Sequence, residues 1–477
     1  MKRLNGMDAM LLYSETPNLH THTLKVAIVD ASEFDGDFTF ELFRETLRQR
    51  LPRLTPLRYK LVAIPWRLHH PMWLEDCEVD LDYHVRRVEV PSPGGRRELD
   101  RLIGDIASTP LDRDRPLWEF HFAEGLQDNR FALIGKVHHT LADGVASVNL
   151  LAQLLDSPDA AQSPPAEAGP PTLPTKPQLL WQAQLDHFHQ MGALAGFIAD
   201  AARGVSRVRR ESRTRPVHPD MAKPFNAPQS FLNHEVSPAR TFATCAMSLT
   251  EVKETSKAYG VKFTDIILAI TSGGLRELLL RYDGRADKPM LATVPIATDR
   301  SPGRMTGNAI SGLIVSLPVH IDNPAERVRL VSLSSASAKH DHELLGPQLQ
   351  GRMMDYLPPT LAPVIFRRQS TQTSNKTMNV AVSTVAGPKV RSSFAGAAVS
   401  EIYSVGILSA GSAFNMTVWS YANQVDLSVL SDDRTFLDIH EATDAMVQSY
   451  AELRNAADLG APVAQVDSTM APAPAVD

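Results

Sequence analysis

Two adjacent histidines and an aspartate fall within one short stretch of this chain. The stretch reads Val137-His138-His139-Thr140-Leu141-Ala142-Asp143-Gly144. Before it, Phe131 to Val137 is short and mostly apolar, which is typical of a buried strand, and after it apolar residues recur at helical spacing from Val145 to Leu155. The pattern predicts that two imidazoles, a carboxylate and a glycine share the turn between a strand and a helix.

Acid–base chemistry by one histidine is the activity that this turn favours. Adjacent side chains of a strand point to opposite faces, so His138 and His139 do not readily bind one metal ion, and no nearby cysteine or glutamate completes a ligand set. No Gly-x-Ser-x-Gly nucleophile elbow occurs. A neutral imidazole can instead take the proton from a hydroxyl that attacks a thioester and then give it to the departing thiolate. Two ordinary structural histidines are the alternative interpretation.

Each residue of the turn has an expected position. Because successive side chains alternate, only one of His138 and His139 should face a reaction cavity, and the other should pack into the fold. Asp143 is expected to fix the turn by accepting backbone N–H groups or by pairing with an arginine. Gly144 would allow a close approach that a side chain would obstruct.

Length and composition predict a globular chain of two domains. Its 477 residues exceed one ordinary core, and the chain is 43% hydrophobic and 21% charged. The formal net charge of −6 gives no global basic field, which disfavours a nucleic-acid partner. The distant Cys77 and Cys245 indicate a reducing compartment without a disulfide framework or a zinc site. No signal peptide is recognised, and no run of about 18 apolar residues occurs, so any membrane contact is expected to be peripheral.

Both halves mix strands and helices with hairpin-like connections, which predicts an α+β fold twice over. The expected parts are an N-terminal domain with the histidine motif (1–157), a proline-rich linker with an amphipathic helix (158–238), a C-terminal domain (239–460) and a disordered tail (461–477). The strand before the histidines should pair antiparallel with the strand Arg115–Phe122. This pairing would place the turn at one edge of a small mixed sheet.

The linker is predicted to contain one long amphipathic helix. From Leu180 to Val208, apolar residues such as Trp181 and Phe188 lie mostly three or four residues apart, and arginines crowd the C-terminal end. The apolar stripe could pack onto the two domains while the arginines stay in solvent. Alternatively, the helix could lie on an anionic lipid surface, where the stripe and the arginines bind acyl chains and headgroups together.

In the second half, a helix is predicted soon after Gly260. Thr264 is placed as its N-cap, and Asp265 follows where the helix dipole favours a carboxylate. Further along, Phe414–Tyr421 and Val425–Leu430 flank a short polar turn and predict a hairpin.

Several motifs, in the same order, resemble the bacterial wax ester synthase/diacylglycerol acyltransferase family. This family lies within the CoA-dependent acyltransferases that include chloramphenicol acetyltransferase and condensation domains. The stretch from His138 to Gly144 resembles its active-site motif H-H-x-x-x-D-G. The other matching segments are Pro116-Leu117-Trp118, Thr264 to Ala269, Gly307-Asn308 and Ser383 to Pro388. The resemblance covers most of the chain, from the N-terminus to about residue 455.

The chain departs from the family pattern at three positions. Thr264 and Thr384 stand where the family has asparagine, and Ala386 replaces a proline. A threonine hydroxyl cannot reproduce the paired donor and acceptor of an amide. If either asparagine positions substrate or an oxyanion in the family, catalysis here is expected to be weaker or retuned.

The resemblance implies two chloramphenicol-acetyltransferase-like α+β domains with an active-site tunnel at their interface. It implies that His139 is the general base, that His138, Asp143 and Gly144 support it, and that acyl-CoA is a co-substrate with no cofactor and no metal. Substrate-binding or structural roles are expected for Trp118, Thr264, Asp265, Gly307, Asn308 and Ser383. Of these, Thr264, Asn308 and Ser383 are candidates for oxyanion stabilisation.

The reaction implied by the resemblance is transfer of a long-chain acyl group from acyl-CoA to diacylglycerol, giving triacylglycerol. Wax ester synthesis from long-chain alcohols is a second expected activity. Two alternatives stay open: an acyltransferase for a smaller secondary-metabolite alcohol, and a catalytically weak homologue that binds acyl-CoA or the surface of lipid inclusions. The reducing compartment and the lack of a recognised signal peptide predict a cytoplasmic protein, and such apolar substrates fit peripheral contact with a membrane or lipid inclusions.

Overall fold

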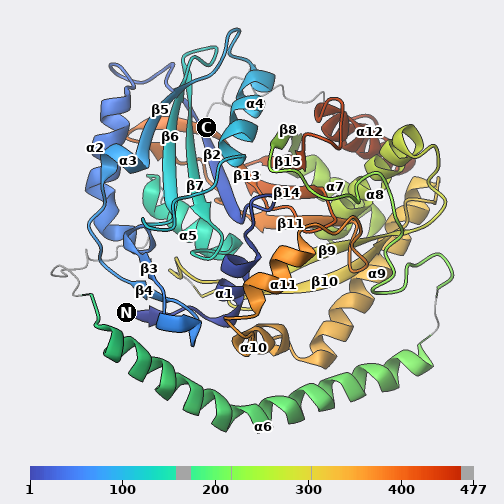
Figure 1. Ribbon diagram of the computed structural model, residues 1–477. Helices are drawn as coiled ribbons and strands as arrows, with labels where there is room; N and C mark the ends of the chain where they lie inside the picture. Colours follow the sequence, from blue (N-terminus) through green and yellow to red (C-terminus); the bar gives the residue numbers. More distant parts are fainter. Residues whose placement is uncertain (157–172, 216–217, 302, 463–477) are drawn as a thin grey trace.

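Two six-stranded sheets lie side by side in the computed structural model, which describes residues 1–156, 173–215, 218–301 and 303–462 (Figure 1). The first sheet has the order β12-β13-β2-β7-β6-β5, and its strands are Ser393–Phe394, Ala397–Val405, His22–Asp30, Arg130–His138, Trp118–Glu124 and Val85–Glu89. The second has the order β10-β9-β11-β14-β15-β8, and its strands are Ile310–Leu317, Met290–Ala297, Val380–Ala386, Phe414–Tyr421, Gln424–Asp432 and Arg240–Ser248. Strands and helices are mixed in both halves, which confirms the predicted α+β fold.

Helices cover both sheets. In the N-terminal half they are α1 (Gly6–Ser14), α2 (Phe40–Arg50), α3 (Leu81–His84), α4 (Arg96–Ala107) and α5 (Gly144–Leu154). After the long α6 (Lys176–Thr214) come α7 (Leu249–Tyr259), α8 (Phe263–Tyr282), α9 (Pro324–Leu345), α10 (Leu349–Asp355), α11 (Ala362–Gln369) and α12 (His440–Ala456). A small sheet of β1 (Lys2–Arg3), β4 (Met72–Leu74) and β3 (Lys60–Val62) lies near the N-terminus, with 3-10 turns η1 (Leu51–Arg53), η2 (Thr55–Arg58) and η3 (Pro65–Arg67) beside it. No described helix is both long and apolar enough to cross a membrane.

The strand that carries the histidines lies in the middle of its sheet. β7 pairs antiparallel with β6, as predicted, and also with β2 on its other side. Its alternate residues feed two cores: Leu133 packs with α2 and α5, and Ile134 packs with α4. The expectation of a small sheet with the turn at one edge is therefore wrong, because β2, from near the N-terminus, and β13, from the C-terminal half, extend the sheet beyond β7.

The boundary between the two sheets does not coincide with the boundary between the two halves of the sequence. β12 and β13 come from the C-terminal half, yet β13 pairs antiparallel with β2 and places the buried Val399 and Ile402 in the N-terminal core. Trp419 of β14 joins the same core. The predicted boundaries 1–157 and 239–460 therefore separate segments of sequence but not the two sheets. Most of the predicted proline-rich segment and tail lies outside the described residues.

The C-terminal core is built around α8, whose residues from Asp265 to Leu275 are buried. Here the expected N-cap is wrong: the helix begins at Phe263 with Lys262 at its cap, so Thr264 lies inside the first turn. The reason is Asp265, whose carboxylate accepts the N–H of Lys262 at 3.1 Å and fixes the start of the helix there.

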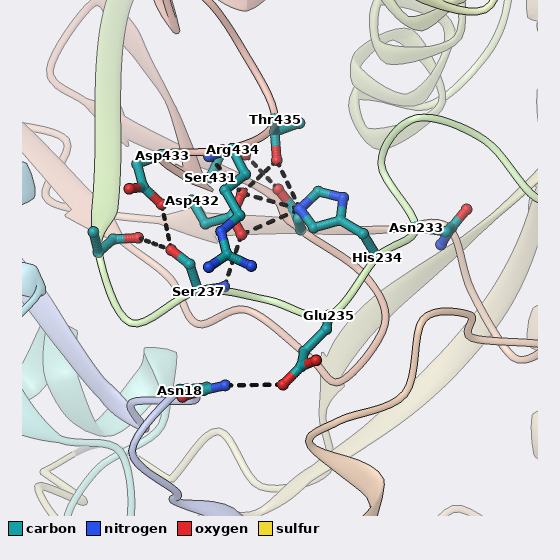
Figure 2. Close-up of polar contacts among 12 residues, drawn as sticks. Asn18, Asn233, His234, Glu235, Ser237, Ser431, Asp432, Asp433, Arg434 and Thr435 are labelled. Carbon is teal, nitrogen blue, oxygen red and sulfur yellow. Dashed lines mark hydrogen bonds and ion pairs between the residues drawn. The ribbon is translucent and has the colours of Figure 1, made fainter.

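The segment before β8 is fastened by the buried carboxylate of Asp432 (Figure 2). Asp432 accepts the N–H of Ser237 at 2.8 Å and pairs with His234 Nε2 at 3.1 Å, and this contact raises the pKa of His234. Next to it, Glu235 accepts a hydrogen bond from Asn18 at 3.3 Å. This cluster thus links the C-terminal sheet to the N-terminal half.

Candidate active site

His139 directly follows the last residue of β7, where the N-terminal sheet meets the loop 298–309 of the C-terminal half. Its backbone N–H donates to Thr21 O at 2.7 Å, and its ring is half-buried. Strand alternation directs Val137 and His139 to one face and His138 to the other. One histidine is therefore available at the junction of the two halves.

The side-chain amide of Asn308 fixes the tautomer of His139. Asn308 Oδ1 lies 2.9 Å from His139 Nδ1, while Asn308 Nδ2 donates to His139 O at 2.7 Å and to Asp8 Oδ1 at 2.8 Å. Because both partners of Nδ2 are acceptors, the amide oxygen must face the imidazole. Nδ1 then carries the ring proton, and Nε2 carries the lone pair that a general base requires.

Asp8, in α1, holds Asn308 in this orientation. Its Oδ1 also accepts the backbone N–H of Asn308 at 2.8 Å, and its carbonyl accepts Thr140 Oγ1 at 2.7 Å. The carboxyl is buried, and burial raises its pKa to about 7, against the opposing effect of the two hydrogen bonds from Asn308. Asp8, Asn308 and His139 thus form a chain in which a carboxyl orients an amide and the amide orients an imidazole.

The surroundings of His139 favour its neutral form. Burial lowers the pKa of the imidazole below its usual range, and the positive charge of Lys25 lowers it further. Lys25 Nζ donates to Ser404 Oγ at 2.7 Å and lies 5.5 Å from the centre of the Trp419 ring. Burial lowers the pKa of Lys25 to about 8, so most of the lysine is still charged at pH 7. A neutral His139 at pH 7 follows.

His138 is part of the scaffold. It is fully buried, its Nδ1 accepts the N–H of Thr140 at 3.1 Å, and its Nε2 lies 2.9 Å from Thr21 Oγ1. Since Nδ1 is an acceptor, Nε2 carries the proton and donates to Thr21. Glu15 lies 3.6 Å from the same nitrogen. Both nitrogens are therefore engaged in holding the turn.

Asp143 connects the turn to the C-terminal half. It both accepts backbone N–H groups and pairs with an arginine, the two contacts expected for it. It is the N-cap of α5 and accepts the N–H of Ala146 at 2.9 Å. Its two oxygens lie 2.9 Å from Arg304 Nη2, and one also accepts the N–H of Ala309 at 2.9 Å. With a side chain only 1% exposed, this carboxylate is bound on every side and is not free to act as an acid.

Two glycines allow the two halves to approach. Gly307 has a φ of +79°, which favours glycine, and its N–H donates to Leu141 O at 2.7 Å. A Cβ on Gly144 would lie 3.3 Å from Val385 of β11. Gly144 therefore permits the close approach that was predicted.

Two cavities lead away from this junction. One is mostly apolar, lies between the first sheet and helices α2 and α5, and is lined by Lys25, Phe120, Val137, Ser147 and Leu151 among others. The other is polar and is lined by Lys2, Arg3, Asp8, Arg304 and Asn308 among others. His139 lies between residues that line the two: Val137 precedes it on β7, and Asn308 binds its ring.

Comparison with known proteins identifies the lineage of this site. A sequence model of the wax ester synthase/diacylglycerol acyltransferase catalytic domain matches residues 4–267, and one of the C-terminal domain of that family matches residues 306–454. A Mycobacterium tuberculosis protein that carries the provisional name diacylglycerol O-acyltransferase is 47% identical over 477 residues, covering 99% of this chain and 100% of the relative. The chain belongs to the wax ester synthase/diacylglycerol acyltransferase family. It is an acyltransferase of lipid biosynthesis.

Solved structures agree with this family. The wax ester synthase/diacylglycerol acyltransferase from Marinobacter aquaeolei VT8 superposes with a TM-score of 0.69 at 28% identity, covering 96% of this chain and 100% of that one. The first condensation domain of the calcium-dependent antibiotic synthetase superposes with a TM-score of 0.60 at 16% identity, covering 98% of each chain. The second likeness concerns the fold alone.

The family motifs are only partly brought together by the fold. The motif from His138 to Gly144 meets Gly307 and Asn308, as the distances above describe. Trp118 lies elsewhere: it is fully buried in the N-terminal core, donates to Leu57 O at 2.7 Å and stacks on His84. Asp265 is buried at the start of α8 and accepts Ser332 Oγ at 3.3 Å. Trp118 and Asp265 therefore serve the core.

Two further positions from the motifs lie on or near the second sheet. Ser383 is half-buried on β11 opposite Thr417, and Thr264 is half-buried in the first turn of α8. Thr384, next to Ser383, precedes Val385, which faces Gly144. Of the departures from the family pattern, Thr384 and Ala386 thus flank a residue that faces the histidine turn, whereas Thr264 does not.

Sequence reasoning missed three residues of this acyltransferase site. Asp8 lies in α1, Lys25 lies in β2, and Arg304 lies in the loop before Gly307. Each comes from a part of the chain far from His139 in sequence. The only available signal was the match at Gly307-Asn308, which marks the loop that also carries Arg304.

Proposed function

We propose that this protein transfers a long-chain acyl group from acyl-CoA to the free hydroxyl of diacylglycerol and forms triacylglycerol. Long-chain alcohols would be a second class of acceptor, giving wax esters. The observation that carries the proposal is the contact of His139 Nδ1 with Asn308 Oδ1, which leaves Nε2 to act as a base, and burial favours the neutral ring by lowering its pKa. Family membership supplies the acyl chemistry, and the two cavities lined by neighbours of His139 are the candidate places for the two substrates.

The proposed reaction is a direct transfer. His139 Nε2 takes the proton of the acceptor hydroxyl as its oxygen attacks the thioester carbonyl carbon. When the tetrahedral intermediate collapses, the C–S bond breaks and the protonated imidazole gives its proton to the CoA thiolate. The reaction forms one ester and one thiol, needs no covalent enzyme intermediate, and uses acyl-CoA as co-substrate with no further cofactor.

The two cavities differ in chemistry, which supports separate places for separate groups. The mostly apolar walls between the first sheet and α5 suit an acyl chain, because burying methylene groups is favourable. The polar cavity with Lys2 and Arg3 at its walls suits a charged or strongly hydrated group. Diacylglycerol and long-chain alcohols reside in membranes or lipid inclusions, so we propose that the enzyme acts at a lipid surface.

The test measures CoA release from long-chain acyl-CoA with diacylglycerol as acceptor. His139→Ala should lower kcat by about 10²- to 10⁴-fold, as expected for loss of a general base. His340→Ala is the matched control, since His340 is exposed on α9 and pairs only with Glu211 among the residues described. Wild-type protein that releases no more CoA than His139→Ala would contradict the proposal.

A second variant tests the orientation of the base. Asn308→Ala removes the acceptor of the His139 Nδ1 proton and should lower kcat/KM by about 10- to 100-fold, the cost of one buried hydrogen bond. An acceptor screen with diacylglycerol, a long-chain alcohol and a small alcohol then separates the alternatives. Wild-type protein that binds acyl-CoA but acylates none of the three would instead support a binding role.

A further inference from the structure

The outer face of α6 is apolar. This helix has 39 residues, is about 58 Å long, and runs beneath both sheets (Figure 1). Trp181 and Met191 are 66% and 70% exposed, and a Cβ added to Gly192 or Gly196 would meet no atom within 4 Å. The large exposed apolar side chains repeat mostly at three- or four-residue intervals or their multiples, so they share one face: Trp181, Leu185, Phe188, Met191, Ile198 and Val205.

The inner face of α6 makes both apolar and polar contacts. Leu179 and Ala183 pack with Ile64 and Met72, and Phe197 stacks on Tyr356. Asp186 pairs with Arg3 at 2.7 Å, and Asp200 pairs with Arg352 of α10 at 2.9 Å. Gln190 donates to Asp355 O at 3.2 Å. A helix of a globular protein normally turns its apolar stripe toward the core and its charges toward water. In α6 Trp181, Leu185 and Phe188 of the predicted stripe are exposed, so for these residues the packing interpretation is wrong.

The surroundings of this face extend the pattern. Trp66 of η3 is 77% exposed, and the next segment touches α6 where His187 Nε2 lies 2.7 Å from Leu68 O. At the C-terminal end of α6, five arginines are exposed to solvent: Arg203, Arg207, Arg209, Arg210 and Arg213. The molecule as a whole carries a net charge of −6, so these arginines form a local basic end on an otherwise acidic protein.

We infer that the outer face of α6 docks on an anionic lipid surface. The exposed aromatic and aliphatic side chains of this face would contact acyl chains, and the arginines at the C-terminal end of α6 would bind phosphate headgroups. The inference deepens the proposed function and takes from it only the reason for being at a lipid surface. Arg3 both binds Asp186 of α6 and lines the polar cavity with Asn308, so α6 lies next to that cavity.

The experiment is co-sedimentation of the full chain with vesicles of phosphatidylcholine containing about 30 mol% phosphatidylglycerol, compared with phosphatidylcholine alone. Changing Trp181, Phe188 and Met191 together to serine should weaken binding by about tenfold or more, because three large apolar groups leave the lipid. Changing Arg207, Arg209 and Arg210 together to glutamine should remove the preference for phosphatidylglycerol and the dependence on salt.

The control is Leu437→Ser, which alters a side chain 95% exposed shortly before α12. Figure 1 shows α12 on the opposite side of the view from α6. It should bind vesicles like the wild type. His139→Ala should also still bind, so failure of the reaction and failure of docking give different results. Thermal unfolding of each variant shows that it is folded.

Two results would overturn the inference. The first is vesicle binding by the folded serine variant that equals that of the wild type. The second is a wild-type dimer that forms without lipid and that the serine variant abolishes, since the apolar face would then bind a second copy of the chain.

Discussion

The basicity of His139 is set first by its burial and then by the charged and polar groups around it. Burial and the charge of Lys25 both favour the neutral ring, whereas the hydrogen bond to Asn308 and the charge of Asp143 favour the protonated ring. The net effect is a lowered pKa. A general base must be unprotonated when the hydroxyl arrives, and the lowered pKa favours that form at neutral pH.

Lys25→Met tests that balance through the pH dependence of kcat/KM, whose acidic limb reports the pKa of the base in the free enzyme. The wild-type limb should lie below the ordinary histidine value of 6.5, because the folded protein disfavours the charged ring. Removing the charge of Lys25 should raise the pKa of His139 and move the limb toward higher pH. Lys253→Met, at an exposed position on α7, should leave the limb in place. A limb that moves to lower pH in Lys25→Met would contradict this account.

The sequence identified His139 because its motif is contiguous, and it could not identify Asp8 or Lys25. A contiguous motif shows which residues share a turn. Asp8 reaches the site because its carboxylate accepts two hydrogen bonds from Asn308, a residue 300 positions away. Nothing in the local pattern around Asp8 records such a partner.

At the level of elements, the site depends on the contacts between the start of α5 and the loop 298–309. Asp143 caps α5 and binds Arg304 of the loop, while Gly307 pairs with Ala142 and Leu141 beside it. Asn308 therefore reaches His139 only while this loop is held. The Asp143 cap and the Asp143–Arg304 ion pair together hold Asn308 against His139.

Asp143→Ala should destabilise the protein by about 2 to 4 kcal/mol, because it removes a helix cap and leaves the largely buried Arg304, among the described residues, with only the more distant Asp299 carboxylate, 3.5 Å from its Nε. Urea unfolding measures the change. Arg304→Met and the double variant complete a cycle, and a coupling of about 1 kcal/mol or more is expected for groups in contact. Additive effects of the two substitutions would show that the ion pair does not fasten the loop.

Element-level prediction succeeded where local periodicity decides and failed where a partner decides. The strand, turn and helix around the histidines follow from apolar spacing alone. Thr264 was misplaced as a cap because Asp265 bonds Lys262 N and starts the helix earlier. The stripe of α6 was visible in the sequence, but a stripe shows which residues share a face and not which way that face turns.

For the whole molecule, the crossing of β12 and β13 joins the two halves into one structure. β13 covers the edge of β2, and the buried Phe394, Val399 and Ile402 complete the core that Leu133 and Trp118 begin. The sequence could not predict this crossing. β12 and β13 lie between β11 and β14 in the chain, and no change in composition marks them as part of the other sheet. The N-terminal sheet is incomplete without the C-terminal half, and so is the site, which needs Asn308.

This crossing predicts that the chain unfolds in one transition rather than domain by domain. Trp118 lies in the N-terminal sheet, and Trp419 comes from the second sheet but packs in the N-terminal core, so both should lose their environment together. Thermal unfolding followed by tryptophan fluorescence and by far-UV circular dichroism should give coincident midpoints, and Trp118→Phe and Trp419→Phe separate the two signals. Two well-separated transitions would mean that each half is stable alone and that the crossing strands contribute little. A single one would mean that the general base and the loop that orients it are kept together by the same cooperative unit that holds the fold.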